Sequence, residues 1–331
     1  MDKTTVSLRQ YLKLYELALS YEGKTPKTLD IYLRNLNRFE RHLAQELQHE
    51  PGMADFTPDA VMDYIMALKT GQRYQGHPYK TPSSKLISAV TLDQHVRTLK
   101  GFATWLHEKR HTRTNLLRDL PRPKLPTLVI EPLTDEEIKR VLASINTRTM
   151  NGARNYAILV VLLDTGLRLG ELCGLTLEDV HLEGKYCYVK VMGKGQRERI
   201  VYLGRRGHEA LLTYQTFVRP HYEHSQAVQH FFLSELGEPI SPGAVQHMMA
   251  KVGKTAGVPR LHPHLLRHTA ATQYLVHGGD VISLQRKLGH SGLEMTNRYV
   301  HFAAQEMAAI QQRIAPMDRL DVKPMRVPKS K

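Results

Sequence analysis

Five side chains between positions 168 and 299 have the types and the order needed to cut a phosphodiester bond. Arg168 and Arg267 carry fixed positive charge on planar forks of donors that match phosphate oxygens. His264 and His290 can move protons near neutral pH, and the Tyr299 hydroxyl can act as a covalent nucleophile. The set predicts phosphodiester cleavage in which no bound metal is required.

The spacing of these groups indicates the elements that must position them. His264 and Arg267 are three residues apart, so on one helix both side chains point in the same direction, toward a common phosphate. Apolar residues alternate with a period of two over residues 186–191 and 199–203, which predicts an antiparallel strand pair. Lys194 lies between glycines at the turn of that hairpin, where a flexible stem could reach the DNA.

Four sequence blocks in this order resemble the tyrosine recombinase (phage integrase) family. The blocks are TGLRLGELCGLTLED at 165–179, GKGQRERIVYL at 193–203, HPHLLRHTAAT at 262–272 and LGHSGLEMTNRYVH at 288–301. Together they frame most of residues 131–301, whereas the first 125 residues match only loosely. Tyr202, where the family often has proline, is a small departure that affects no catalytic position.

The resemblance implies a role for each candidate residue. Arg168 and Arg267 correspond to the family's paired catalytic arginines, and Lys194 to its general-acid lysine. His264 corresponds to the proton-transfer histidine. His290 corresponds to a histidine that hydrogen-bonds the scissile phosphate, and Tyr299 corresponds to the tyrosine nucleophile. Glu171 corresponds to a supporting buried acid. Arg197 and Arg199 are expected to be neighbouring phosphate contacts.

The predicted fold has two domains joined by a linker. Residues 1–122 read as an N-terminal all-α bundle, which the resemblance identifies as a SAM-like core-binding, DNA-binding domain. Prolines concentrate in residues 123–133, which predicts the linker. Residues 134–314 are expected to form a mixed α/β, mainly helical catalytic domain with a small antiparallel sheet, and residues 315–331 a basic tail.

The composition favours an extended polyanion as partner. Lys and Arg number 46 against 32 Asp and Glu, which gives a net charge of +14, and 41% of residues are hydrophobic. Basicity alone does not separate DNA from RNA or a membrane surface. No apolar stretch is long enough to span a bilayer and no signal sequence is evident, so a cytoplasmic protein is expected. Cys173 and Cys187 are expected to be reduced packing residues.

Neither a metal nor a nucleotide cofactor is predicted. The run from His107 to His111 matches the HExxH pattern of zinc proteases, but no third ligand is evident. Two Gly-Lys-Thr tripeptides, at 23–25 and 253–255, lack the upstream glycine of a phosphate-binding loop. A phosphotyrosine conserves the energy of the broken bond, so ATP should be unnecessary.

The resulting hypothesis is a site-specific DNA recombinase that acts through a covalent 3′-phosphotyrosyl intermediate. It would work on double-stranded DNA as a homotetramer, in integration or excision, transposition or dimer resolution. By resemblance, residues 302–314 would dock on a neighbouring subunit, although they could instead pack on their own domain. The rival hypotheses are a type IB topoisomerase-like enzyme and a non-catalytic DNA-binding protein with the same fold.

Overall fold

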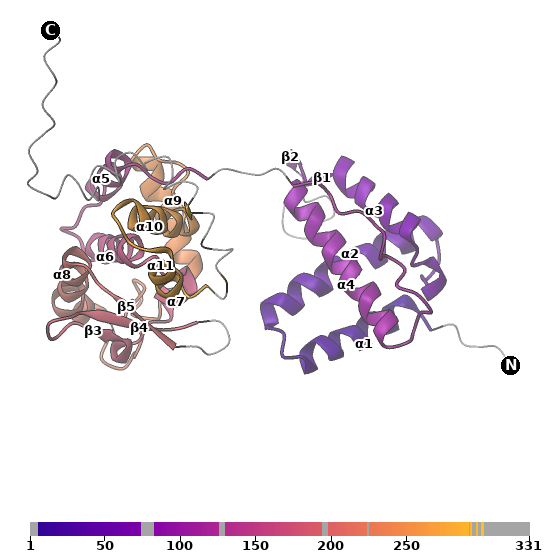
Figure 1. Cartoon of the computed structure of the whole chain (residues 1–331), viewed down its shortest axis with the longest axis horizontal. Coiled ribbons are helices and arrows are strands. Elements are labelled where there is room, and N and C mark those ends of the chain that lie inside the picture. Colours follow the sequence, from indigo (N-terminus) through magenta and orange to yellow (C-terminus); the bar gives the residue numbers. More distant parts are fainter. Residues whose placement is uncertain are drawn as a thin grey trace, which may run out of the picture. The chain divides into compact units, whose positions relative to one another are not determined.

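The structure is a computed structural model that describes residues 6–73, 83–125, 130–193, 198–223, 225–290, 292, 296, 299 and 300. The chain divides into two compact units, residues 1–128 and 129–331 (Figure 1). Each unit has its own hydrophobic core. The division falls inside the proline-rich stretch at 123–133. Within the described ranges, every helix is too short or too polar to cross a lipid bilayer.

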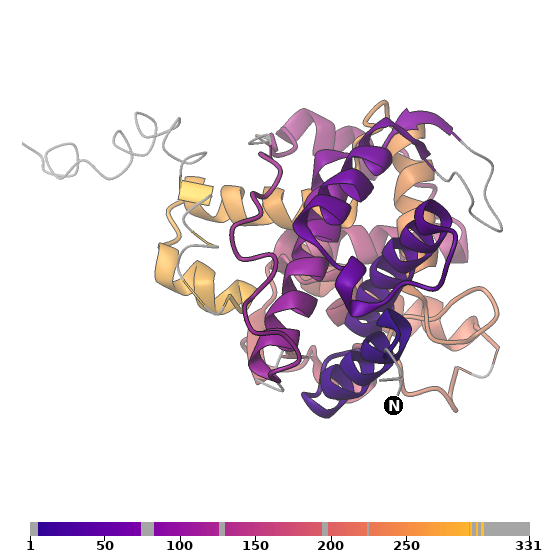
Figure 2. The ribbon, with the colours of Figure 1, turned by 90° about the vertical axis from the view of Figure 1, so that its right-hand side faces the viewer.

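The first unit is a helical bundle. Its four helices are α1 (Leu8–Tyr21), α2 (Pro26–Leu47), α3 (Pro58–Thr70) and α4 (Ala89–Glu108), with a short 3-10 turn, η1, at Met53–Asp55. A small hairpin, β1 (Gln72–Arg73) with β2 (Ser83–Leu86), precedes α4. Helix α4 packs against both α2 and α3 (Figures 1 and 2). The expected bundle is confirmed.

Side-chain caps fix where the helices of this unit begin. The Thr25 hydroxyl accepts a hydrogen bond from the backbone N–H of Thr28, and Thr57 accepts one from Ala60 at 3.2 Å. Proline follows each cap at the first helical position, where no N–H is needed. The Thr-Pro dipeptides at 25–26 and 57–58 therefore mark where α2 and α3 begin.

A buried carboxylate anchors the chain where it leaves the bundle. Asp93 on α4 is 2% exposed and accepts two hydrogen bonds from the Arg122 guanidinium, at 2.8 and 2.9 Å. These hydrogen bonds outweigh the opposing effect of burial, so the pKa of Asp93 lies below its usual range. The proline-rich segment therefore starts from a fixed point on α4.

The second unit is mainly helical with a small sheet, which confirms the predicted fold class. Its helices are α5 (Asp135–Ala143), α6 (Met150–Thr165), α7 (Leu169–Cys173), α8 (Arg205–Thr213), α9 (Pro242–Thr255), α10 (Pro263–Val276) and α11 (Val281–Leu288). Strands β3 (Val180–His181), β4 (Tyr188–Met192) and β5 (Glu198–Tyr202) form an antiparallel sheet in the order β3-β4-β5. Shorter turns are η2 (Leu177–Asp179), η3 (Tyr214–Val218) and η4 (Arg219–His221).

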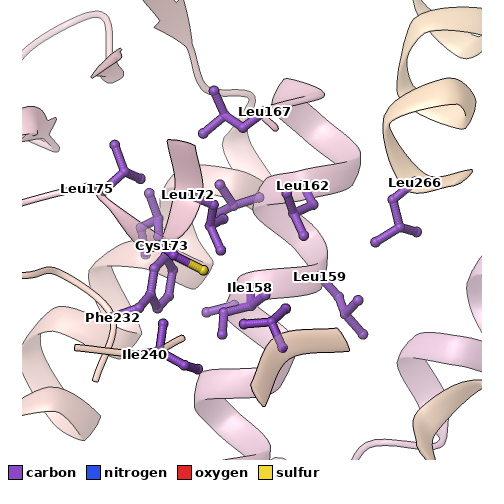
Figure 3. Packing of buried hydrophobic residues seen from close by; sticks show 14 of the residues in the cluster. Ile158, Leu159, Leu162, Leu167, Leu172, Cys173, Leu175, Phe232, Ile240 and Leu266 are labelled. Carbon is purple, nitrogen blue, oxygen red and sulfur yellow. The ribbon is translucent and has the colours of Figure 1, made fainter. Parts of the chain in front are cut away.

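Helix α6 is the centre of this unit. It contacts α7, α8, η3 and α10, and its apolar side chains are buried on several sides. Figure 3 shows Ile158, Leu159 and Leu162 of α6 between Leu266 of α10 on one side and Phe232 on the other. A helix packed in this way is rigid, so its C-terminal end offers a fixed platform for the residues that follow.

Candidate active site

Arg267 lies at the centre of the candidate site. It projects from α10, is only 6% exposed, and donates to two backbone carbonyls, those of Gly166 at 2.6 Å and Leu288 at 2.8 Å. Both carbonyls belong to helix C-termini, of α6 and α11, where the helix dipole is negative and favours a cation. Arg267 thus joins two chain segments that are more than a hundred residues apart.

The charge of Arg267 survives its burial. Burial disfavours the charged guanidinium and the nearby Arg168 repels it, so together they lower the pKa of Arg267 to about 10. That value is still well above neutral pH. Arg267 therefore presents a full positive charge inside a desolvated site, where charge acts most strongly.

Two glycines turn the chain into the site at these helix ends. Gly166 (φ 68°) and Gly289 (φ 64°) both adopt the left-handed conformation at the C-cap, which glycine accepts without cost. A Cβ at Gly166 would lie 2.9 Å from Leu288 Cδ2, and one at Gly289 would lie 3.0 Å from the Arg199 guanidinium. The glycines therefore provide both the turn and the space.

Arg168 and Glu171 form a local pair at the start of α7. Glu171 Oε1 accepts from Arg168 Nη1 at 2.9 Å, and Oε2 accepts from the Arg168 backbone N–H at 2.8 Å. The Arg168 side chain is 37% exposed, whereas that of Glu171 is 8% exposed. The carboxylate thus holds the arginine from the buried side and leaves part of its guanidinium facing outward.

Arg199 shares the same carboxylate. Its Nη1 and Nη2 donate to the two oxygens of Glu171 at 3.0 and 2.7 Å, and its Nε donates to the Lys287 carbonyl at 2.9 Å. The expectation that Arg199 contacts phosphate is wrong for this arrangement, because its guanidinium is directed at protein acceptors. Sequence reasoning could not foresee this pairing, since 28 residues separate Arg199 from Glu171.

The Glu171 carboxylate stays ionised in spite of its burial. Burial raises its pKa, but the hydrogen bonds from Arg199 and Arg168 lower it by more, so the net shift is downward. Glu171 is therefore an acceptor at neutral pH, as the predicted supporting role requires.

His290 and Thr296 form a second part of the site. His290 Nε2 lies 3.0 Å from Arg267 Nη2, and Nδ1 lies 2.9 Å from the Thr296 hydroxyl oxygen. A guanidinium can only donate, so Nε2 accepts and the neutral ring carries its proton on Nδ1, toward Thr296. Thr296 is not among the residues predicted from the sequence. A hydroxyl six residues after a candidate histidine is the only signal, and it is a weak one.

Tyr299 is almost fully buried beside these groups. It is 2% exposed and packs with Leu284 and Leu288 of α11. Its ring lies nearly parallel to that of His290, with the ring centroids 6.2 Å apart. The centroid of the His268 ring is 5.1 Å from that of Tyr299. The structure therefore brings Tyr299 and His290 together, next to Arg267.

The other two predicted residues are placed differently. His264 occupies the first turn of α10, where it is exposed, while Arg267 one turn later is buried. Lys194 lies outside the described residues, as do Arg197 and residues 302–314. The structure thus assembles Arg168, Glu171, Arg267, His290 and Tyr299, and gives His264 a solvent-facing position on the same helix as Arg267.

The described part of the chain contains no group of three His, Cys, Asp or Glu side chains that could hold a metal ion. The HExxH match at 107–111 does not form a helical ligand pair, because α4 ends at Glu108 and Arg110 has φ 60°. His111 instead packs on Trp105, with ring centroids 5.4 Å apart. The two histidines of the motif therefore have separate structural surroundings.

Comparison with known proteins gives consistent results. The model of the phage integrase family matches residues 131–306. Tyrosine recombinase XerC from Myxococcus xanthus is 30% identical over 324 residues, which cover 94% of this chain and 99% of that protein. The XerH recombinase bound to its palindromic difH substrate has 20% identity and a TM-score of 0.67, over 88% of this chain and 80% of that one. A lambda integrase tetramer on a Holliday junction has 19% identity and a TM-score of 0.67, over 90% of this chain and 78% of that one.

Proposed function

The chain belongs to the phage integrase family and is a site-specific tyrosine recombinase, and we propose that it cuts and rejoins double-stranded DNA through Tyr299. One observation carries the assignment of the nucleophile. The buried guanidinium of Arg267 contacts His290, whose ring lies parallel to that of Tyr299. A phenol beside a desolvated cation and a histidine is suited to attack a phosphate.

In the proposed cleavage step the Tyr299 oxygen attacks the scissile phosphorus. A phosphotyrosyl ester forms on the 3′ side, the bond to the 5′ oxygen breaks, and the 5′ hydroxyl leaves. The phenol proton passes to a base, and a general acid protonates the leaving oxygen. We assign His264 to the first transfer and Lys194 to the second on the strength of the family resemblance, with Arg168, Arg267 and His290 around the phosphate.

The same chemistry run backward joins strands. A 5′ hydroxyl from another DNA strand attacks the phosphotyrosine, restores the phosphodiester and releases Tyr299. The number of phosphate ester bonds is unchanged in each step, so the exchange needs no nucleotide hydrolysis. We therefore propose that the enzyme requires neither ATP nor a metal cofactor.

Substrate binding has to uncover the nucleophile. Tyr299 is only 2% exposed, and it packs among apolar side chains of α10 and α11. A phosphate can reach its hydroxyl only if DNA binding rearranges this neighbourhood. The proposed consequence is that free protein holds the phenol away from water and from wrong substrates until DNA is in place.

The proposed assembly is a tetramer on DNA. The net charge of +14 favours DNA binding, and the fold is that of lambda integrase, which has been observed as a tetramer on a Holliday junction. Under this proposal residues 1–122 bind the core site together with the catalytic domain, and residues 302–314 contact a neighbouring subunit. The proposed place of action is the cytoplasm, because the substrate is DNA.

A trapping experiment tests the nucleophile. Sheared and nicked genomic DNA from the source organism is incubated with the full chain, and adducts that survive detergent are isolated. We expect adducts on one enriched sequence with the wild type and none with Tyr299→Phe, which should still bind DNA. Tyr299 is the only tyrosine between Leu288 and the C-terminus, so a modified peptide from this region identifies it by mass spectrometry.

The trapping experiment, together with a plasmid-relaxation assay, separates the alternative functions. Adducts formed by Tyr299→Phe would assign the nucleophile to another residue. Relaxation of plasmids without regard to sequence would indicate topoisomerase activity. Sequence-specific binding with no adduct under any condition would indicate a DNA-binding protein that has lost cleavage.

A further inference from the structure

Arg199 is a largely buried, fully hydrogen-bonded arginine beside the candidate site, and the proposed reaction does not use it. It lies on β5, its side chain is 11% exposed, and its three nitrogens donate to Glu171 and to the Lys287 carbonyl. The two bonds to Glu171 are a bidentate pair with a buried carboxylate, the strongest arrangement available to an arginine. An interaction this well satisfied fixes the positions of the elements it connects.

Each of those elements lies close in the sequence to a proposed catalytic residue. Strand β5 begins at Glu198, four residues after Lys194 in the sequence. Glu171 on α7 holds Arg168, and Lys287 lies three residues before His290. Arg199 therefore contacts both the carboxylate that holds Arg168 and the helix end that precedes His290.

We propose that Arg199 is a positioning residue, which acts through Glu171 and the end of α11 to set Arg168 and His290 around one phosphate. The inference rests on the proposed function, because it concerns the geometry of that same site. Arg199 itself touches no DNA under this proposal.

The division of the Glu171 oxygens explains why Arg199 is needed. Arg199 takes both carboxylate oxygens through its fork, while the Arg168 side chain takes one oxygen through Nη1 alone. Without Arg199, the buried carboxylate would be balanced only by Arg168 and would draw that guanidinium inward. Arg168, 37% exposed in the intact site, would then be less available to a phosphate.

Gly289 makes this arrangement possible. A Cβ at this position would lie 3.0 Å from Cζ and 3.0 Å from Nη1 of Arg199. A side chain at residue 289 would therefore press on the guanidinium where it reaches the α11 end. The contact ties the position of Arg199 to the turn that delivers His290.

The test compares Arg199→Met with Arg199→Lys in single-turnover cleavage of a nicked duplex, at protein concentrations that saturate binding. We expect DNA affinity to stay within about threefold, because Arg199 faces protein acceptors. Cleavage by Arg199→Met should fall about 100-fold, the scale of a misplacement near 1 Å. Lysine keeps the charge but not the fork, so it should restore only part of the rate.

A double variant tests whether the effect passes through Glu171. If it does, Arg199→Met combined with Glu171→Gln should cleave no more slowly than the slower single variant. The double variant also leaves no unpaired buried charge, so it can be measured even if Arg199→Met alone unfolds. Arg206→Met is the matched control, because it removes an arginine from neighbouring α8 whose side chain is 76% exposed. Its cleavage should match the wild type.

The outcomes separate this inference from the proposed function. If the wild type forms adducts and Arg199→Met cleaves equally fast, the positioning role is wrong. Fully additive losses in the double variant, or a large loss of DNA affinity with an unchanged cleavage rate, would also overturn it and would favour a direct phosphate contact. A wild type that forms no adduct would refute the proposed function instead.

Discussion

Gly289→Ala is the substitution that most directly tests how the site is built. Gly289 has φ 64° at the end of α11, and its missing Cβ leaves room for the Arg199 guanidinium. Alanine should therefore have two effects, a strained backbone and a displaced arginine. Gly257→Ala provides the matched control, because Gly257 has φ 69° and a Cβ added there would meet no described heavy atom within 4 Å.

The two effects have different sizes. Placing a Cβ in the left-handed conformation costs about 1 to 2 kcal/mol at either glycine. At Gly289 the contact with Arg199 adds about 1 to 3 kcal/mol, as expected for an inserted carbon in a packed site. Gly289→Ala should therefore lose more stability than Gly257→Ala. It should also cleave about 100-fold more slowly, since the shift reaches Glu171 and Arg168.

Calorimetry of the full chain, together with single-turnover cleavage, makes the comparison. For a unit of this size each kcal/mol lowers Tm by about 2 to 4 °C, so the difference between the variants is measurable. Gly257→Ala should cleave like the wild type. Equal losses of stability in the two variants, with normal cleavage by Gly289→Ala, would show that Arg199 does not depend on the space at Gly289.

Two further predictions concern hydrogen bonds at His290 and at the buried carboxylate of Asp93. Thr296→Val removes the acceptor of His290 Nδ1–H and should slow cleavage about fivefold, the equivalent of a hydrogen bond worth about 1 kcal/mol. Thr296→Ser keeps the hydroxyl and should cleave normally. An unchanged rate in the valine variant would mean that Thr296 does not set the histidine tautomer. Asp93→Asn should destabilise the N-terminal unit at neutral pH, whereas Asp30→Asn, from an exposed ion pair, should have little effect. Because the folded pKa of Asp93 is lowered, the stability that its carboxylate contributes is present above the ordinary value of 3.8 and is lost as pH falls through the folded pKa. Thermal unfolding at acid pH should therefore show the Tm values of wild type and Asp93→Asn converging. A difference in Tm that persists in strong acid would contradict this.

Several helix starts and the strand pair follow local sequence patterns. Thr134 caps α5 and exchanges hydrogen bonds with Glu137, as the capping-box pattern indicates, and the strand pair at β4 and β5 follows from the period of two. The five-residue π-helical turn at Tyr214–Val218 was not predicted. Its irregular hydrogen bonding depends on packing against α6 and α8, which no local pattern records.

The sequence supplied most of the candidate residues but none of their long-range contacts. Family resemblance supplied Arg168, Arg267, His290 and Tyr299, since their motifs are read directly from the chain. The partners of Arg199 came only from the fold, because its pairing with Glu171 requires β5 to lie beside α7. Long-range contacts of this kind depend on how helices and strands pack together, and nothing in the sequence near Arg199 indicates them.

The charge balance of the site supports the reaction proposed for it. Three guanidinium groups, those of Arg168, Arg199 and Arg267, lie near the single carboxylate of Glu171, which pairs with the first two. Arg267 is held by helix-end carbonyls, which carry only partial negative charge. These four residues therefore leave two positive charges uncompensated. A phosphodiester brings one negative charge and gains another as the tyrosine attacks, so this excess stabilises the transition state more than the bound substrate, as catalysis requires.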